Sequence, residues 1–133
     1  MEISASAHAA ALWVGLHLIL LLVLSVLVVR QRRTHGVVFG DADVPALALA
    51  VRAFGNATEY VPAGLIAIVT LAVVGAPPLI VHIAGLALLL GRIAYAVGLS
   101  RSGGVSIGRT VGVTLTWLAY IVAAVALVFY AIP

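Results

Sequence analysis

Charged residues are scarce in this chain of 133 residues, and lysine and cysteine are absent. Only 8% of the residues are charged and 65% are hydrophobic, whereas soluble domains carry about 25% charged residues. A water-soluble globule of this composition could not cover its surface, which argues against a soluble enzyme and against a nucleic-acid-binding protein. Without cysteine, the chain can form no disulfide, no thiolate metal site and no cysteine nucleophile. The composition therefore predicts a protein of the lipid bilayer.

Four apolar stretches have the length of membrane-spanning helices, which need roughly 20 residues each. The connections between them are short, which favours an up-down arrangement of neighbouring helices. We therefore predict an all-α integral membrane protein: a single domain over residues 1–133 that forms an up-down bundle of four transmembrane helices. The predicted spans are about residues 9–29, 44–74, 79–99 and 110–132.

The positive charges outside the spans gather in two of the three loops. An up-down bundle places these two loops at the same end. Because arginine-rich short loops stay in the cytoplasm, this end is predicted to be cytoplasmic and both termini to lie on the opposite side of the membrane. The five arginines are Arg30, Arg32 and Arg33 after the first span, and Arg101 and Arg109 between the third and the fourth.

Three ionisable residues, Arg52, Glu59 and Arg92, lie inside predicted spans, where charges are costly and usually face the bundle interior or a wet cavity. At 100° per residue, Asn56 lies about 40° from Arg52, and Glu59 about 20° from it on the other side. These three residues are predicted to form one polar stripe. Arg52 and Arg92 each lie about seven residues from the loop end of their span, so they should converge with Glu59 at one depth, beside Tyr95.

Two interpretations of this polar cluster stay open at this point. The excess of positive charge suits an anionic ligand whose carboxylates accept paired hydrogen bonds from arginine. The same charges could instead form an intramembrane ion pair that fixes helix register and subunit packing. No metal site is expected, because the four histidines are scattered and lack the spacing of metal ligands.

The stretch Val51–Pro62 resembles the MAPEG family, the membrane-associated proteins of eicosanoid and glutathione metabolism. It contains the family's Arg-x-x-x-Asn-x-x-Glu-Tyr pattern in full. The first loop, Gly36–Asp41, and the segment Gly91–Gly98 of the third span are also similar to the family. The resemblance covers nearly the whole chain and indicates a bacterial-type member, which we expect in a bacterial inner membrane.

This resemblance implies a homotrimer with glutathione, a co-substrate, bound between subunits near the cytoplasmic face. It further implies a glutathione transferase or peroxidase, in which an arginine stabilises the glutathione thiolate for attack on a lipophilic substrate that arrives from the membrane lipids. Arg101 and Arg109 compete for that catalytic role. By matching position, the residues that would hold glutathione are Arg30, Arg52, Asn56, Glu59, Tyr60, Arg92 and Tyr95.

Two other classes of protein are alternatives. Small multidrug-type transporters also have four short spans and an intramembrane glutamate, but they usually place it in the first helix, which is uncharged here. A cation-exchange carboxylate is also disfavoured because Glu59 has a cationic neighbour. The second alternative is a noncatalytic membrane interaction protein that uses the polar stripe to lock subunits together.

Overall fold

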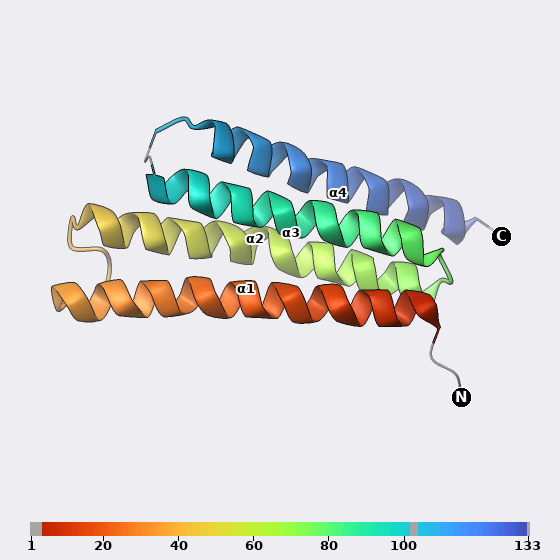
Figure 1. Ribbon diagram of the computed structural model, residues 1–133, viewed down its shortest axis with the longest axis horizontal. Coiled ribbons are helices and arrows are strands. Elements are labelled where there is room, and N and C mark those ends of the chain that lie inside the picture. The colour runs from red at the N-terminus through yellow and green to blue at the C-terminus, as the bar shows by residue number, and fades with distance from the viewer. Residues whose placement is uncertain (1–3, 102–103, 133) are drawn as a thin grey trace.

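The computed structural model describes residues 4–101 and 104–132, which form an all-α bundle (Figure 1). Successive helices run in opposite directions, so the α1–α2 and α3–α4 loops lie at one end and both termini lie at the other (Figure 1). We call the first of these the loop end. Ser102 and Gly103, in the α3–α4 loop, lie outside the described residues. The helices are α1 (Ala5–His35), α2 (Pro45–Val73), α3 (Pro78–Arg101) and α4 (Ile107–Ala131).

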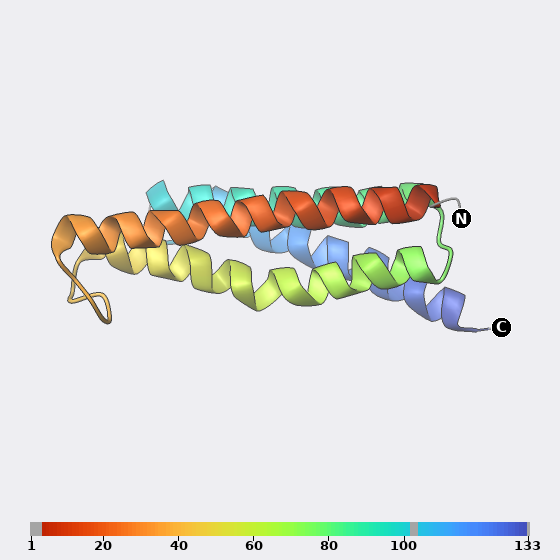
Figure 2. The same cartoon turned by 90° about the horizontal axis from the view of Figure 1, so that it is seen from below.

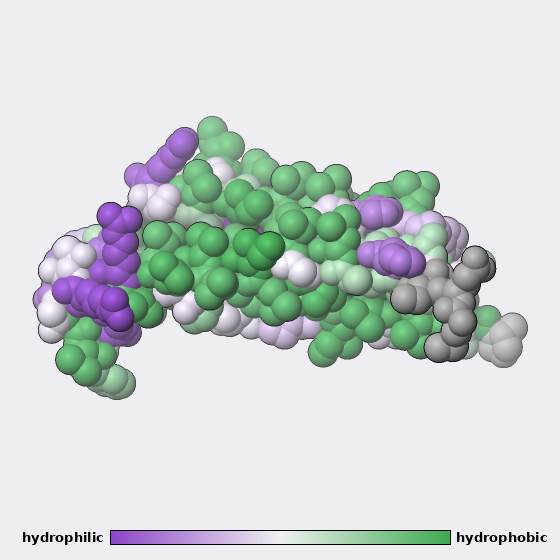
Figure 3. Space-filling view, turned by 60° about the horizontal axis from the view of Figure 1, so that its bottom comes forward, coloured by the Kyte–Doolittle hydropathy of each residue, from purple (hydrophilic) through white to green (hydrophobic). Residues whose placement is uncertain are grey.

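All four helices are long and apolar enough to cross a membrane. A broad hydrophobic surface covers the middle of the molecule, and strongly hydrophilic side chains gather at the loop end (Figure 3). The four predicted spans are thus found as four helices. Which end faces the cytoplasm stays a prediction from the arginine count.

The helix bounds differ most from the prediction in α1, which is 31 residues long. At 1.5 Å per residue it measures about 46 Å, more than the roughly 30 Å hydrocarbon core. The helix continues through the arginines and ends at His35, where Gly36 follows as the cap: its φ of 66° is left-handed and its N–H donates to the carbonyl of Arg32. An apolar run marks the hydrocarbon region, whereas backbone hydrogen bonding decides where the helix ends.

The other three helices agree more closely with the predicted spans. The start and end of α2 each differ by one residue, and α3 extends two residues further, to Arg101. Helix α4 begins three residues early, because the side chain of Ser106 accepts a hydrogen bond from the backbone N–H of Arg109 and caps the helix. Helix α2 bends near its middle (Figure 2), and Pro62, inside this helix, cannot donate a backbone hydrogen bond.

Glycines set the close packing of α3 against α4, the most extensive helix pair of the bundle. A Cβ added at Gly98 would lie 2.7 Å from the backbone nitrogen of Arg109, and one added at Gly112 would lie 2.6 Å from that of Tyr95. Only glycine permits the two backbones to approach so closely. This glycine seam fixes the position of α4, and with it the groups that α4 contributes to the interior.

A second set of contacts places α1 against α2 and α3. Trp13 packs directly over Gly85 of α3, and its indole N–H donates to Nδ1 of His82 at 3.1 Å. One turn further, His17 is fully buried. Its Nδ1 lies 2.7 Å from the carbonyl of Trp13, whereas its Nε2 has no hydrogen-bond partner among the described residues.

Replacing His17 with leucine is expected to leave the free energy of unfolding unchanged or to raise it by about 1 kcal/mol, because an unsatisfied buried nitrogen is removed. His82→Leu is the matched control. It should lower stability by about 1 kcal/mol, because Trp13 would lose its acceptor. Both values can be measured by denaturant unfolding in micelles. A large loss of stability in His17→Leu would contradict the assignment of an unpartnered nitrogen.

Candidate functional site

The centre of the bundle holds a buried arginine, Arg92 of α3, with only 2% of its surface exposed. Its Nη1 donates to Oδ1 of Asn56 at 2.5 Å, and its Nε donates to the hydroxyl of Thr116 at 3.0 Å. Its Nη2 donates to the same hydroxyl at 2.6 Å and to the carbonyl of Gly112 at 3.2 Å. One guanidinium therefore joins α2, α3 and α4.

Three tyrosines surround this guanidinium. Its central carbon lies 4.8 Å from the ring centre of Tyr60 and 5.2 Å from that of Tyr95, within cation–π range. Tyr120 of α4 donates its hydroxyl to the carbonyl of Tyr60 at 2.6 Å, and the two rings lie 6.2 Å apart. The charge of Arg92 is thus balanced by neutral acceptors and ring faces rather than by a carboxylate.

Arg52 and Glu59 form an ion pair of their own on the outer face of α2. Their Nη1 and Oε1 atoms are 3.4 Å apart, and the two side chains are 58% and 54% exposed. It is the only ion pair between residues in the described ranges 4–101 and 104–132. Because Glu59 is paired with an arginine, it does not resemble an exchangeable carboxylate of a transporter.

The predicted polar stripe is therefore split, which corrects the sequence-based grouping. Asn56 is 5% exposed and points into the bundle, whereas Arg52 and Glu59 face outward. The 60° between Asn56 and Glu59 is enough to place them on opposite sides of the boundary between interior and surface. Arg92 does come to the level of Glu59, because its guanidinium lies 4.8 Å from the ring centre of Tyr60, the next residue. Its side chain bonds Asn56 and Thr116, however, and not Glu59.

Arg109 of α4 extends this cluster toward the loop end. Its guanidinium carbon lies 5.6 Å from the ring centre of Tyr95, and its Nη1 donates to the carbonyl of Gly104 at 2.6 Å. The side chains of Tyr95 and Arg109 line an open cavity of about 380 Å³, together with residues of α4 such as Thr110 and Trp117. Tyr95 thus lies between two arginines, the buried Arg92 and the more accessible Arg109.

The remaining two candidates lie apart from this cluster. Arg30, near the end of α1, and Arg101, the last residue of α3, are exposed, and neither side chain bonds another described residue. Neither lines the cavity beside Tyr95. Of the two arginines that compete for the catalytic role, the structure therefore places Arg109, not Arg101, beside the other candidate residues.

Sequence reasoning missed Thr116, Gly112 and Tyr120, which supply α4's share of the polar interior. Thr116 and Gly112 are one turn apart and both accept from Arg92, and the Thr116 hydroxyl also donates to the Gly112 carbonyl at 2.8 Å. A threonine one helical turn after a glycine, within an apolar span that packs against a helix with an internal arginine, is the sequence signal that could have identified Thr116 and Gly112. No group of potential metal ligands exists among residues 4–101 and 104–132.

Comparisons with known proteins agree on one family. The model of the MAPEG family matches residues 10–129, which include parts of all four helices. Over 121 residues the chain is 33% identical to inner membrane protein YecN of Escherichia coli strain K12, and the match covers 91% of each chain. The protein of the same name from Escherichia coli strain CFT073 matches equally well. No solved structure matches the chain.

Proposed function

The chain belongs to the MAPEG family, and from this premise we propose that it binds glutathione and activates the thiol for attack on lipophilic electrophiles or peroxides. Its reaction would be that of a membrane-bound glutathione transferase or peroxidase, with glutathione as co-substrate. The related YecN is named an inner membrane protein. We assign the same membrane to this chain, with the loop end in the cytoplasm and both termini on the other side.

The exposed ion pair of Arg52 and Glu59 carries this proposal. Glu59 is the fifteenth of the 29 residues of α2, so it lies near the middle of a membrane-spanning helix. Exposed charges at such a depth are costly in lipid and are usually covered by protein or a wet cavity. A homotrimer that buries this face of α2 at subunit contacts would cover them. The two carboxylates and the ammonium of glutathione would complement Arg52 and Glu59 at that contact.

The other candidate residues take two roles in this proposal. Asn56 and Arg92 are bonded to each other inside the bundle, and they position the rings of Tyr60 and Tyr95. Arg30 of a neighbouring subunit would provide a further contact to a glutathione carboxylate. The tripeptide would then lie between the outer face of α2 and the loop end of the bundle.

Arg109 is the residue that we propose for activation of the thiol. An ordinary thiol with a pKa near 8.5 is mostly protonated at neutral pH, and a nearby guanidinium favours the thiolate, which is the nucleophile. Arg109 lines the open cavity beside Tyr95. The thiolate formed there would attack an electrophilic carbon of a substrate from the bilayer, forming a C–S bond as the leaving group departs. With a peroxide it would attack oxygen, so that the O–O bond breaks and the alkoxide leaves and takes up a proton, and a second glutathione would then convert the sulfenic acid to the disulfide with release of water.

Titration of the purified protein with glutathione, followed by the ultraviolet absorbance of the thiolate, tests this proposal. Arg109→Ala should reduce the thiolate signal at saturating glutathione about tenfold or more, which corresponds to a pKa change of one unit or more. Arg101→Ala should leave this signal close to that of the unchanged protein. Arg52→Ala should instead weaken binding by roughly tenfold to a hundredfold, because a charged hydrogen bond is lost.

Arg33→Ala is the charge-matched control, because Arg33 is exposed at the loop end and lies outside the proposed site. It should change neither binding nor the thiolate signal. If a well-folded protein shows no glutathione binding, the proposal fails. Binding without a thiolate signal would favour the second candidate, a noncatalytic membrane interaction protein, which the fully internal hydrogen bonding of Arg92 to Asn56 and Thr116 also fits.

A further inference from the structure

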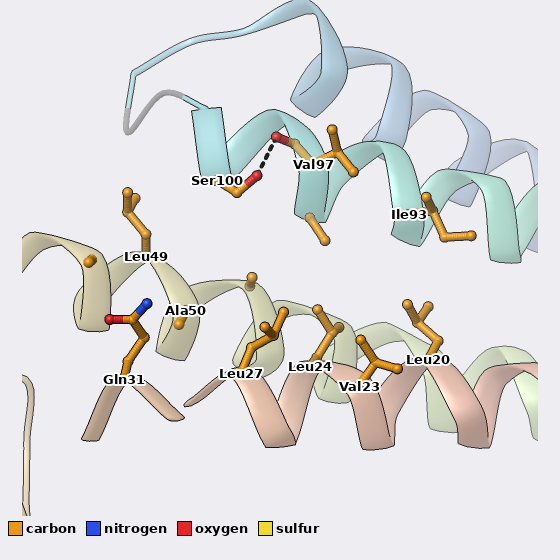
Figure 4. A pocket seen from close by; sticks show the side chains of 13 residues that line it. Leu20, Val23, Leu24, Leu27, Gln31, Leu49, Ala50, Ile93, Val97 and Ser100 are labelled. Carbon is orange, nitrogen blue, oxygen red and sulfur yellow. Dashed lines mark hydrogen bonds between the residues drawn. The ribbon is translucent and has the colours of Figure 1, made fainter. Parts of the chain in front are cut away.

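A second cavity, which neither Arg92 nor Arg109 lines, opens between α1, α2 and α3 in the half of the bundle nearest the loop end (Figure 4). Its volume is about 460 Å³, within the range of small-molecule sites. Leu20, Val23 and Leu24 of α1 form one wall, and Ile93 and Val97 of α3 form the other. We call this cavity the α1–α3 groove.

The groove is apolar along its length and polar at one end. Of the 13 residues that line it, only Gln31 and Ser100 have polar side chains. Both lie at the loop end of the groove, whereas Leu20 and Ile93 lie toward the centre of the bundle (Figure 4). The Ser100 hydroxyl donates to the carbonyl of Val97 at 2.8 Å, and the Gln31 amide bonds no other described residue. This pattern matches an amphiphile whose polar group lies at the loop end.

Two arginines flank the polar end of the groove, although neither lines the cavity itself. Arg30 follows Val23 by seven residues and so lies about 20° from it around α1. Arg101 follows Val97 by four residues and lies about 40° from it around α3. Both arginines are exposed, and neither side chain has a partner in residues 4–101 or 104–132. The charge at the mouth of the groove therefore complements an anionic headgroup.

We propose that the α1–α3 groove binds an anionic phospholipid, with one acyl chain along its apolar walls and the phosphate between Arg30 and Arg101. Basic pockets between membrane helices on the cytoplasmic side are known to select anionic lipid headgroups. The groove differs from a flat lipid-facing surface because helices on three sides enclose the chain. This inference shares Arg30 with the proposed glutathione site and is otherwise independent of it, so the variant that fills the groove, rather than Arg30→Gln, distinguishes the two proposals.

Native mass spectrometry of the full-length protein in detergent, without glutathione, tests the proposal. Phosphatidylglycerol and phosphatidylcholine with identical acyl chains are titrated separately. We expect the dissociation constant for phosphatidylglycerol to be lower by about tenfold or more, since each arginine near an anionic headgroup contributes roughly fivefold. Arg30→Gln and Arg101→Gln should each reduce that preference about fivefold. Arg33→Gln is the control, because Arg33 lies about 80° from Val23 around α1, whereas Arg30 lies about 20° from it.

A second arm fills the groove without changing its charge. Ala50→Leu combined with Ala96→Leu narrows the groove from two sides and should weaken phosphatidylglycerol binding at least tenfold, since each displaced methylene is worth roughly fourfold in affinity. Ala124→Leu, the same change at an exposed position of α4, should leave binding unchanged. Circular dichroism confirms that each variant is folded.

Three results would overturn the proposal. The first is equal affinity of the unchanged protein for the two lipids. The second is undiminished phosphatidylglycerol binding in the folded Ala50→Leu/Ala96→Leu variant. The third is a change of oligomeric mass in that variant, which would assign the groove to contact with another copy of the chain. A glutathione titration of the same variant separates the two proposals, because glutathione binding should persist when the groove is filled.

Discussion

Replacing Asn56 with leucine is expected to lower the free energy of unfolding by about 3 kcal/mol or more, because it leaves the buried guanidinium of Arg92 without its carboxamide acceptor. Arg92 is 2% exposed and cannot reach water without separating α2, α3 and α4. In a bilayer the uncompensated charge has no alternative partner of comparable strength. Denaturant unfolding in micelles, followed by circular dichroism, gives the loss of stability.

The double variant Asn56→Leu/Arg92→Leu makes this expectation specific. A buried polar pair replaced as a whole by apolar residues is often neutral or stabilising, whereas removal of one partner is destabilising. We therefore expect the double variant to be more stable than Asn56→Leu alone. Arg92→Lys should also lower stability, because a compact ammonium cannot donate hydrogen bonds to both Asn56 and Thr116 in the way that the planar guanidinium does. A double variant less stable than Asn56→Leu would contradict the assignment.

Replacing Gly112 with alanine is the second change with a large expected effect. The added Cβ would lie 2.6 Å from the backbone nitrogen of Tyr95 and 2.7 Å from the backbone oxygen of Gly91. Backbone atoms cannot rotate away as a side chain can, so α3 and α4 must separate. We expect a loss of about 3 kcal/mol, at the upper end of the range for overpacked interiors.

The same substitution should also disturb the chemistry of the site. Separation of α3 from α4 moves Thr116 away from Arg92 and Arg109 away from Tyr95, so the glutathione thiolate signal should fall together with stability. Gly15→Ala is the matched control, because a Cβ there meets nothing within 4 Å. It should leave stability equal or slightly raised, since alanine is the better helix former. Equal stability of the two alanine variants would contradict the close approach of α3 and α4.

The bundle itself could be predicted because its signals are local. Apolar runs of the required length predicted four spans, and the arginines marked two loops that the structure places at one end (Figure 1). The predicted first span was shorter than α1, since the helix continues past the apolar run as far as His35, before the cap residue Gly36. Hydropathy indicates which residues contact lipid, but it does not predict how far a helix continues outside the hydrocarbon region.

The candidate site could be predicted only in part. Spacing placed Arg52 and Glu59 on one face of α2, and the structure pairs them at 3.4 Å. It could not show that Asn56, 60° from Glu59, lies inside the bundle, because that depends on where α3 and α4 cover α2. Nor could it name Thr116 and Tyr120, which are one turn apart on another helix and unremarkable in sequence.

By itself, the sequence determined that this protein lies in a lipid bilayer, how many spans it has, where its charges lie along the chain and, through its motifs, to which family it belongs. Only the tertiary structure decided which polar groups meet. Helical periodicity gives the direction of a side chain around its own axis, whereas its partner depends on how closely and at what depth the next helix packs. Here the glycine seam between α3 and α4 sets that distance, and it brings Thr116 to Arg92 and Arg109 to Tyr95.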